Sequence, residues 1–405
     1  MSQKNVLIAG GGIGGLAAAL ACGRAGCQVE LFERAAAFAE VGAGIQIGPN
    51  VTRILHAWNL ADTLAAVAAF PDCLQVRDAV SGRELGVLPL GKTAVQRYGA
   101  PYATLHRADL HQLLHAAVRQ QTSAILSLDN AVTGFVQTPR QVEVQTHDGR
   151  AFGRDLLLGA DGLWSVVREG LLADGPPRVT GHLAYRAMVS QAALPARLRS
   201  QRITVWLGRR LHVVQYPVRG GEWLNVVGIV QADADPSPPA VAAPAGAAAS
   251  DAADWGQHTS ARRLRAALAD TCAPLQDLLH VMDEWHRWVL CDRPTVRRAD
   301  QLARGRVALL GDAAHPMRPY LAQGAGMAIE DAAALGRVLA DSPLDIVAAL
   351  RAYADTRWQR NARVQARAER NGTIFHARGP MRAGRNLVMG LLGERLLDLP
   401  WLYRG

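Results

Sequence analysis

Cysteine is scarce in this sequence. Only five of the 405 residues are cysteines, and no two of them form a CxxC pair: Cys22, Cys27, Cys73, Cys272 and Cys291. An odd and scattered set of this kind argues against a disulfide framework and against a zinc site. We therefore expect buried thiols in a reducing compartment, and no bound metal.

The sequence also lacks a long uninterrupted apolar run. The stretch from Val6 to Cys22 is apolar, but glycines between Gly10 and Gly15 interrupt it, which favours a tight turn over a membrane span. The polar residues 1–5 lead into this stretch without the basic segment and cleavage site of a secretory leader. These absences predict a cytoplasmic protein that does not associate with a membrane.

Charge is not concentrated in one segment. The formal net charge is +9, but the arginines are spread along the chain, and no aromatic-interleaved basic stripe accompanies them. This distribution argues against a nucleic-acid partner and favours small anionic ligands. Hydrophobic residues make up 49% of the chain and charged residues 20%, so a packed core is expected, and the length favours two interleaved domains.

The N-terminal segment follows the order strand, glycine-rich turn, helix, strand. Residues 6–9 predict a strand, residues 16–24 a helix and residues 28–32 a second strand. Such a βαβ unit implies a parallel sheet with helices on its faces. The turn reads Gly10-Gly-Gly12-Ile13-Gly14-Gly15, which fits G-x-G-x-x-G in the context that this motif requires.

This turn has the features that bind a dinucleotide. Gly10 allows the tight turn, Gly12 lets the backbone approach a pyrophosphate, and Gly15 permits close helix packing. The N-terminus of the helix faces the negative charge. Glu33 ends the second strand, where its carboxylate can accept hydrogen bonds from a ribose. A glycine-rich turn without a ligand would leave Glu33 unexplained.

Later segments predict a second sheet and further helices. Alternating apolar patterns predict strands of an antiparallel sheet at residues 75–78, 141–145, 203–206, 213–216 and 224–230. Residues 232–254 are rich in Ala, Pro, Ser and Asp, which indicates a mobile surface loop.

The C-terminal part repeats the order of the N-terminus before it becomes helical. A strand pattern at 306–310 precedes Gly311-Asp312 and a helix at about 326–340. From residue 344 to about 377 the chain is helical and rich in arginine, and Pro380 separates a short last helix.

Two of these later segments resemble motifs of a known family. Residues 158–168, Leu-Gly-Ala-Asp-Gly-Leu-Trp-Ser-Val-Val-Arg, resemble the DG motif of the flavoprotein aromatic hydroxylases, the family of the para-hydroxybenzoate hydroxylases. Gly311-Asp-Ala-Ala-His-Pro316, with its continuation to residue 332, resembles their GD motif. The three motifs occur in the family's order and at similar intervals, so the resemblance covers residues 6–340.

The resemblance implies an α/β fold: a Rossmann-like FAD-binding domain with an inserted antiparallel β-sheet substrate domain and C-terminal helices. The FAD-binding domain would comprise residues 1–74, 101–180 and 293–344. The substrate domain would comprise residues 75–100 and 181–292, with the mobile loop within it, and residues 345–405 would form the C-terminal helical segment.

The resemblance also implies an enzyme, a monooxygenase with tightly but non-covalently bound FAD. Electrons would come from NADH or NADPH and oxygen from O2, and a flavin 4a-hydroperoxide would hydroxylate a small phenolic or heteroaromatic acid. No second glycine-rich dinucleotide module is evident, so NAD(P)H would bind only transiently.

Cofactor contacts follow from the same resemblance. Asp312 would bind a ribityl hydroxyl, and backbone N–H groups at 324–327 would stabilise the negative charge of a reduced flavin. Arg107 would reach FAD phosphate or ribose oxygens unless it forms a surface ion pair, and Asp161 would lie near the pyrophosphate unless it is an ordinary turn residue. The implied set is Gly10, Gly12, Ile13, Gly14, Gly15, Glu33, Arg34, Gly44, Ile45, Arg107, Asp161, Gly311, Asp312, Pro316, Gly324, Ala325, Gly326 and Met327.

His212 and Tyr216 are the candidate catalytic pair. They stand four positions apart in a predicted strand and so share one of its faces. A free phenol has a pKa of about 10, so electrophilic attack on its ring at neutral pH needs a base or hydrogen-bond acceptor nearby. This stretch resembles the 3-hydroxybenzoate 6-hydroxylases, in which the matching histidine acts on the phenol and the matching tyrosine orients it. The alternative is a hydrogen-bonded structural pair.

The substrate pocket combines features of several branches of the family. Arg186 matches an arginine that faces the flavin, with a sheet-surface charge as the alternative. Pro319 is typical of 6-hydroxynicotinate 3-monooxygenases, whereas Gln46 differs from the histidine that those enzymes carry. We favour 3-hydroxybenzoate and leave salicylate 1-hydroxylation and 6-hydroxynicotinate 3-hydroxylation open. The implied substrate contacts are Gln46, Arg186, Pro316, Tyr320 and Gln323.

Other classes of function account for fewer of these motifs. A simple NAD-dependent dehydrogenase explains residues 10–33 and nothing later. A flavin-dependent halogenase needs a lysine-bearing pocket and a tryptophan motif, which the sequence does not show. A non-enzymatic FAD-binding regulator keeps the flavin motifs without needing His212 and Tyr216. A homodimer is compatible with the arginine-rich C-terminal helix but does not follow from it.

Overall fold

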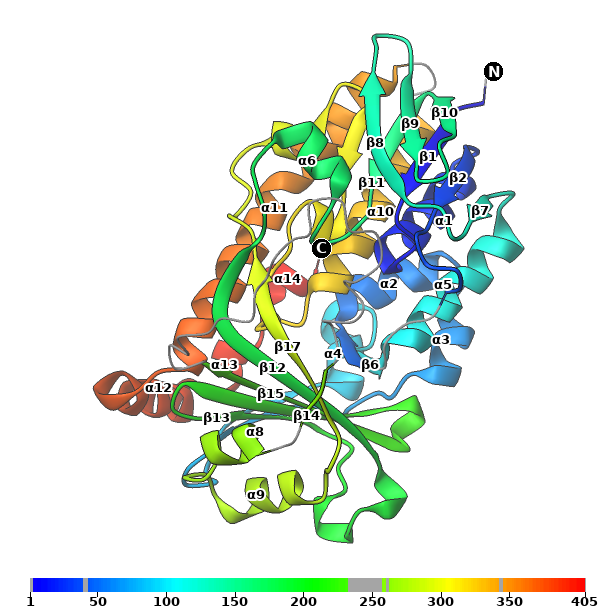
Figure 1. Ribbon diagram of the computed structural model, residues 1–405. Coiled ribbons are helices and arrows are strands. Elements are labelled where there is room, and N and C mark those ends of the chain that lie inside the picture. The colour runs from blue at the N-terminus through cyan, green and yellow to red at the C-terminus, as the bar shows by residue number, and fades with distance from the viewer. Residues whose placement is uncertain (1–2, 39–42, 232–256, 260–261, 342–344, 405) are drawn as a thin grey trace.

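Two sheets form the framework of the protein. The computed structural model describes residues 3–38, 43–231, 257–259, 262–341 and 345–404. A mainly parallel sheet with flanking helices occupies the upper part of Figure 1, and a larger sheet crosses the lower part. The predicted mobile loop at 232–254 lies outside the described residues.

The smaller of these two sheets has six strands in the order β18-β19-β11-β1-β2-β7. β1 pairs in parallel with β2 and with β11, and β11 pairs in parallel with β19. Their bounds are β1 (Asn5–Ala9), β2 (Gln28–Phe32), β7 (Ile125–Ser127), β11 (Leu156–Gly159), β18 (Ala303–Arg304) and β19 (Val307–Leu309). All residues of β11 and β19 are buried, as expected where helices cover both faces of a parallel sheet.

Helices α1 (Ile13–Arg24), α5 (Arg107–Gln121) and α10 (Gly324–Asp341) pack around this sheet, with α1 between the other two. A Cβ atom at Gly336 would lie only 3.0 Å from the Cβ atom of Ala21, so small residues let α1 and α10 approach closely. The other helices of this part are α2 (Pro49–Ala57), α3 (Ala61–Val67), α4 (Gly91–Tyr98) and α6 (Val166–Leu172). Two small sheets accompany them, formed by β3 (Gly44–Ile47) with β6 (Ala103–His106), and by β8 (Val132–Gln137), β9 (Val142–Thr146) and β10 (Ala151–Arg154).

The larger sheet has eight strands in the order β16-β17-β12-β15-β14-β13-β4-β5. Their bounds are β4 (Cys73–Asp78), β5 (Glu84–Pro89), β12 (Arg178–Ser190), β13 (Ile203–Leu207), β14 (Leu211–Val218), β15 (Trp223–Gln231), β16 (Gln257–Thr259) and β17 (Trp285–Asp292). The prediction of an antiparallel sheet needs two corrections. First, β13 and β4 pair in parallel; they are distant in sequence and are not joined by a hairpin, which would require antiparallel pairing. Second, residues 141–145 belong to the small sheet of β8, β9 and β10.

The faces of the eight-stranded sheet have different neighbours. Leu211 and Val213 of β14 pack in a core with α8 (Arg262–Ala267) and α9 (Ala273–His280), which lie below the sheet in Figure 1. Because side chains alternate along a strand, His212, Val214 and Tyr216 point to the opposite face, toward the parallel sheet and its helices.

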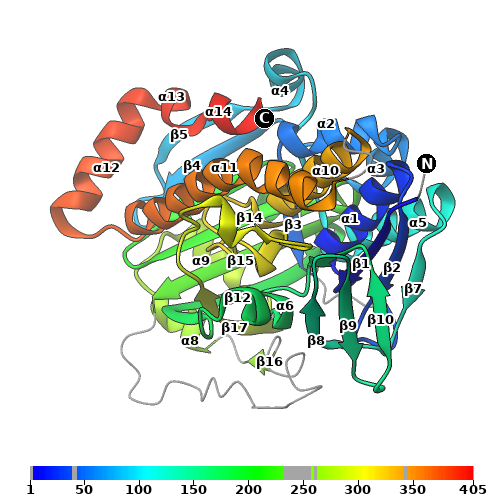
Figure 2. The same cartoon turned by 90° about the horizontal axis from the view of Figure 1, so that it is seen from above.

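The C-terminal helices connect the two sheets. α11 (Ile346–Phe375) packs against α10 and runs out over the larger sheet, and the chain then returns along β5 (Figure 2). Pro380 stands at the start of α12 (Gly379–Leu392), as predicted. The expectation of a single last helix was wrong, because α13 (Glu394–Leu397) and α14 (Pro400–Tyr403) follow after Gly393.

The cysteines form no disulfide. Cys22 and Cys27 are buried, whereas the other three are half-buried, so the prediction of buried thiols holds for only two of them. Among the described residues, no helix combines the length and apolarity needed to cross a lipid bilayer.

Candidate active site

The glycine turn after β1 has the shape of a phosphate cradle. Gly10 has φ +98°, and a Cβ atom there would lie 2.5 Å from the carbonyl oxygen of Ala160. A Cβ atom at Gly15 would lie 1.8 Å from the oxygen of Gly10, whereas one at Gly12 would meet nothing within 4 Å. Among the described residues, the space above Gly12 is therefore open. No side chain caps α1 and no acid lies in its first turn, so its N–H groups remain available to an anion such as the FAD pyrophosphate.

Glu33 stands directly beside this turn. One carboxylate oxygen accepts a hydrogen bond from Gly11 N at 2.6 Å, and the other accepts from Ala35 N at 2.9 Å. Glu33 thus braces the glycine turn, in addition to the predicted contact with a ribose. His111 of α5, which sequence reasoning missed, donates from Nε2 to the oxygen of Gly11 at 2.7 Å. Its place on α5 gives no signal that it contacts a turn one hundred residues earlier.

Asp161 organises the DG segment after β11. Its carboxylate accepts from the Ser165 hydroxyl at 2.5 Å and from Val167 N at 3.1 Å, so it stabilises the start of α6. Burial raises the pKa of Asp161, and these hydrogen bonds oppose the rise. Arg168 then reaches across to the GD segment, where its guanidinium donates to the carbonyl oxygens of Ala313 and Ala314 at 3.0 and 2.7 Å. The two motifs are therefore joined directly.

Asp312 and Arg107 lie close enough to affect each other's pKa, and the concave surface beside them is called the groove. Asp312 is exposed, yet desolvation raises its pKa, with His315 and Arg107 opposing that rise. Desolvation also lowers the pKa of Arg107, and Asp312 opposes this shift. A side chain that is both solvent-accessible and desolvated lies in a concave surface. This position suits the predicted contacts with the ribityl and phosphate groups of FAD.

The N-terminus of α10 opens onto the same groove. The first backbone hydrogen bond at this end of the helix runs from Met327 N to the carbonyl oxygen of Gln323. The N–H groups of residues 324–326 precede it and therefore have no acceptor within the helix. A Cβ atom at Gly324 would meet only Asp312, at 4.0 Å. Gly326 differs, because a Cβ atom there would lie 2.9 Å from the side chain of Val51. The space beside Gly324 is thus open among the described residues, while Gly326 is needed for packing on α2.

The loop between β19 and α10 is held by buried polar contacts. His315 Nε2 hydrogen-bonds Asp331 at 2.5 Å, and its Nδ1 is buried with no partner in the described part of the chain. The carbonyl oxygen of Pro316 accepts from Gln365 of α11 at 3.1 Å. Pro316, placed beside the flavin by the resemblance, is therefore fixed by α11.

The predicted catalytic pair and the predicted substrate contact Arg186 share the inner face of the larger sheet. Strand pairing sets Arg186 of β12 and Val214 of β14 on either side of Val227, so Arg186 lies on the same face as His212 and Tyr216. Gly44 touches this face: its N–H donates to the Asn225 side chain at 2.8 Å, and a Cβ atom there would lie 2.7 Å from the Tyr216 ring. The backbone predicted to run beside the flavin thus meets the predicted catalytic tyrosine.

Burial dominates the electrostatics of this face. It raises the pKa of Tyr216, with Arg186 opposing the rise. It lowers the pKa of Arg186 to about 10, which Tyr216 opposes and Arg107 reinforces. The Arg186 guanidinium lies 4.5 Å from the ring centroid of Trp288, and its Nε is buried with no partner in the described residues. A desolvated cation of this kind favours an anionic ligand.

His212 lies in an aromatic enclosure. It is 1% exposed, and the ring centroids of Tyr320, Phe375 and His376 lie 5.1–5.3 Å from its own. Burial lowers its pKa well below the usual range, with His376 and His182 adding to the effect, so the ring is neutral at pH 7. Its Nδ1 shares a hydrogen bond with His376 Nε2 at 2.8 Å.

The remaining predicted substrate residues have protein partners or lie enclosed. The Gln46 amide oxygen accepts from the Tyr102 hydroxyl at 2.8 Å, and the Gln323 amide oxygen accepts from Asn50 at 3.2 Å. The Tyr320 hydroxyl is buried without a partner in the described part of the chain. Sequence reasoning missed Asn225, Trp288 and His376. The alternation of side chains along a strand could have placed Asn225 and Trp288 on the inner face of the sheet. His376 follows a long helix, and no sequence pattern indicates that it contacts this face.

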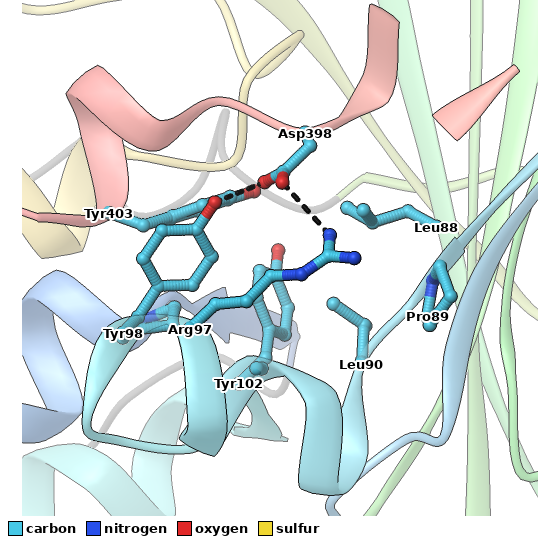
Figure 3. Close-up of a pocket in the computed structure, with 10 residues that line it drawn as sticks. Leu88, Pro89, Leu90, Arg97, Tyr98, Tyr102, Asp398 and Tyr403 are labelled. Carbon is cyan, nitrogen blue, oxygen red and sulfur yellow. Dashed lines mark hydrogen bonds and ion pairs between the residues drawn. The ribbon is translucent and has the colours of Figure 1, made fainter. Parts of the chain in front are cut away.

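A small cavity lies between α4 and the C-terminal end, with Tyr102, the partner of Gln46, in its lining (Figure 3). Its volume of about 10 Å³ is at the lower limit for one water molecule. Arg97 and the Tyr98 hydroxyl both bind Asp398 beside it. This arrangement indicates a packing gap where the C-terminus is anchored, and not a ligand site.

Comparisons with known proteins identify the family of this chain. A family described as "FAD binding domain" matches residues 3–368. The chain is 38% identical to 3-hydroxybenzoate 6-hydroxylase 1 of Aquipseudomonas alcaligenes, over 99% of this chain and 98% of that protein. It is 36% identical to 6-hydroxynicotinate 3-monooxygenase of Bordetella bronchiseptica, over 90% of each.

A solved structure of Klebsiella pneumoniae HpxO, complexed with FAD and uric acid, has a TM-score of 0.83 and 26% identity, and covers 99% of this chain and 96% of that one. The phosphate cradle, the groove at Asp312 and the two joined motifs thus occur in a chain that is similar to flavin hydroxylases over nearly its full length. The protein belongs to the FAD-dependent aromatic hydroxylases, a family of flavoprotein monooxygenases.

Proposed function

We propose that this enzyme hydroxylates a small phenolic aromatic acid with O2 and NADH or NADPH, and that 3-hydroxybenzoate, attacked at position 6, is its substrate. The observation that carries the proposal is the placement of His212, Tyr216 and Arg186 on one buried sheet face beside Gly44. Three relatives named 3-hydroxybenzoate 6-hydroxylase, 35–38% identical over 98–99% of this chain, support the choice of substrate.

The cofactor contacts in this proposal use the residues around the groove. Gly12 and the first turn of α1 would hold the pyrophosphate, Glu33 the adenosine ribose, and Asp312 with Arg107 the ribityl chain and phosphates. When bound, FAD supplies the redox and oxygen chemistry, which no side chain provides. The free N–H groups of residues 324–326 would face negative charge at the N-terminus of α10.

The substrate residues act on the phenol and its acid group. His212 is neutral, so its Nε2 can accept the phenolic proton, which makes the ring electron-rich at neutral pH. The Tyr216 hydroxyl orients the ring by donating a hydrogen bond, since burial keeps it protonated. Arg186 supplies a desolvated positive charge that favours an anion on this face. The apolar side chains of Val227 and Ile229 exclude water.

A panel of acids tests the substrate. Holoenzyme is incubated with 3-hydroxybenzoate, salicylate, 6-hydroxynicotinate or 4-hydroxybenzoate and with NADH or NADPH, and both nicotinamide oxidation and product identity are measured. We expect 3-hydroxybenzoate to be hydroxylated at position 6. Hydroxylation of salicylate or 6-hydroxynicotinate alone would select those alternatives, and a yellow protein with no stimulated oxidation would indicate the non-enzymatic regulator.

The catalytic role is tested with His212→Ala. We expect bound FAD to be unchanged, hydroxylation to fall by about 10²–10⁴-fold, and peroxide release to increase, because the phenol loses its proton acceptor. His280→Ala, which changes an exposed histidine on α9, is the matched control. A His212→Ala variant that hydroxylates at the parent rate would rule out the base.

The cytoplasmic location and the homodimer stay predictions. Cell fractionation tests the first, and sedimentation equilibrium of the purified holoenzyme tests the second.

A further inference from the structure

Three buried histidines form a cluster behind the proposed substrate site. His182 comes from β12, His212 from β14, and His376 from the residue that caps the end of α11. They are 7%, 1% and 5% exposed. The ring of His376 lies between the other two, with centroid distances of 5.1 Å to each.

The central contact is the hydrogen bond of 2.8 Å between His212 Nδ1 and His376 Nε2. A bond between two neutral imidazoles contains one proton, so two arrangements exist. When the proton is on His212 Nδ1, Nε2 of His212 carries a lone pair. When it is on His376 Nε2, the Nε2 of His212 carries a hydrogen and cannot accept another.

A phenolic substrate distinguishes these arrangements. Its O–H group is a donor, so a protonated His212 Nε2 would place two donors opposite each other. The arrangement with the proton on His212 Nδ1 instead lets the phenol donate to Nε2, while His376 Nε2 accepts from the other side. No group of the described chain hydrogen-bonds His212 Nε2, so this nitrogen is available to a ligand.

The surroundings of His376 keep it neutral. Burial and the nearby charges of His182, Arg385 and Arg318 lower the pKa of His376 to about 3. Arg385 of α12 donates to the carbonyl oxygens of Phe375 and Ile374 at 2.9 and 3.2 Å, and Arg318 is paired with Asp292. A neutral His376 retains one nitrogen lone pair, and this is the Nε2 acceptor that His212 needs when the proton of His376 is on Nδ1, which has no hydrogen-bond partner in the described residues.

We propose that His376 is a positioning residue that fixes the ring orientation of His212 and its Nδ1-protonated tautomer, so that Nε2 accepts the phenolic proton. This inference rests on the proposed function. In the step, the phenolic O–H bond breaks and an N–H bond forms at Nε2 with the nitrogen lone pair, and no electrons are transferred. Burial disfavours the resulting imidazolium, and its Nδ1–H bond to a neutral His376, which becomes charge-assisted, offsets part of that cost.

The first test reads the tautomer without turnover. Oxidised holoenzyme labelled with ¹⁵N-histidine is examined by NMR, with His212→Gln to assign the His212 signals. We expect a protonated Nδ1 and an unprotonated Nε2 in the parent holoenzyme before 3-hydroxybenzoate is added. A proton on Nε2 under these conditions would contradict the proposal, whatever the rate of hydroxylation.

The second test compares two substitutions of His376. His376→Phe keeps a ring of similar size without an acceptor, whereas His376→Gln keeps an acceptor oxygen near the position of Nε2. We expect His376→Phe to lower kcat by about 10–100-fold with little change in KM, and to shift the pH profile of kcat, while His376→Gln recovers most of the rate. FAD content and circular dichroism verify folding, and His280→Gln is the control.

Each outcome can be assigned to one of the two proposals. A His376→Phe variant with the parent rate, or a His376→Gln variant as slow as His376→Phe, would overturn the positioning role. If His212→Gln hydroxylates at the parent rate, the proposed base fails, and the positioning role in catalysis fails with it. In that case the NMR signals still report whether His376 sets the tautomer of His212.

Discussion

Gly44 is the point where the backbone from the cofactor side touches the substrate sheet. Its N–H donates to Asn225, and the Tyr216 ring occupies the place of the missing side chain. A Cβ atom would lie 2.6 Å from Cγ of Asn225 and 2.7 Å from Cε2 of Tyr216, and both partners are buried. The position of Tyr216 therefore depends on the absence of a side chain at residue 44.

We predict that Gly44→Ala destabilises the protein by about 1–3 kcal/mol, because the added methyl overpacks a buried contact. It should also raise KM for the aromatic acid, since Tyr216 must move. Urea unfolding and steady-state kinetics measure the two effects. The matched control is Gly134→Ala in β8, where a Cβ atom would meet nothing within 4 Å. Equal stability of the two variants would contradict this account.

For single residues, the sequence indicates which side chains can carry the chemistry better than it indicates which distant residues they contact. The period of two in a strand places His212 and Tyr216 on one face, and the register supports that arrangement. The bond from His212 to His376 spans 164 positions. No local pattern encodes it, because it depends on where the end of α11 meets β14.

Helices α10 and α11 are joined by buried charges. Arg357 donates to Asp331 and to Glu330 at 2.8 Å each, and Arg360 donates to Glu330 at 2.6 Å. Burial would raise the pKa of Asp331, but His315 and Arg357 together lower it to about 2. Asp331 is therefore ionised in the folded protein and holds both α11 and the loop that carries Pro316.

This pKa gives the direction of a pH effect. Because the pKa of Asp331 falls from an ordinary 3.8 to about 2 on folding, its stabilisation is present above pH 4 and is lost as the pH falls toward 2. We predict that Asp331→Asn is less stable than the parent at pH 7, and that the difference shrinks between pH 4 and 2. Urea unfolding at several pH values measures it. A difference that grows with acidity would contradict the assignment.

Elements with a strong local pattern were predictable, and pairings between distant segments were not. The strands at 6–9 and 28–32 and the helix at 326–340 coincide with β1, β2 and the interior of α10. The sequence did not predict the parallel pairing of β13 with β4 or the helices after Gly393, because both depend on packing between distant segments. The domain boundaries stay predictions.

On the scale of the whole molecule, the cofactor groove combines segments that are distant in sequence. Gly12, Arg107, Asp161 and Asp312 follow β1, β6, β11 and β19 respectively. A ligand in this groove would therefore contact segments from residue 12 to residue 312, so its binding should stabilise the entire fold.

We predict that removing FAD lowers the melting temperature, and that added FAD restores it in a concentration-dependent way, with about 2.7 kcal/mol gained at 100 times the Kd. Differential scanning calorimetry measures the change. Gly12→Ala separates folding from binding, because its Cβ atom would meet no atom of the described residues within 4 Å but would occupy the space proposed for the pyrophosphate. Its apoprotein should melt close to the parent apoprotein and gain little from FAD. An unchanged gain would contradict the placement of the pyrophosphate.

The order of the parallel sheet also has a consequence for biosynthesis. β11 lies between β1 and β19, and the groove is completed by α10, which begins at Gly324. At roughly 5–20 residues per second, the ribosome needs about 15–60 s to proceed from the first glycine turn to that helix. During this interval β11 has an unpaired edge and the groove lacks α10, so the edge is open to incorrect strand pairing until β19 has been made.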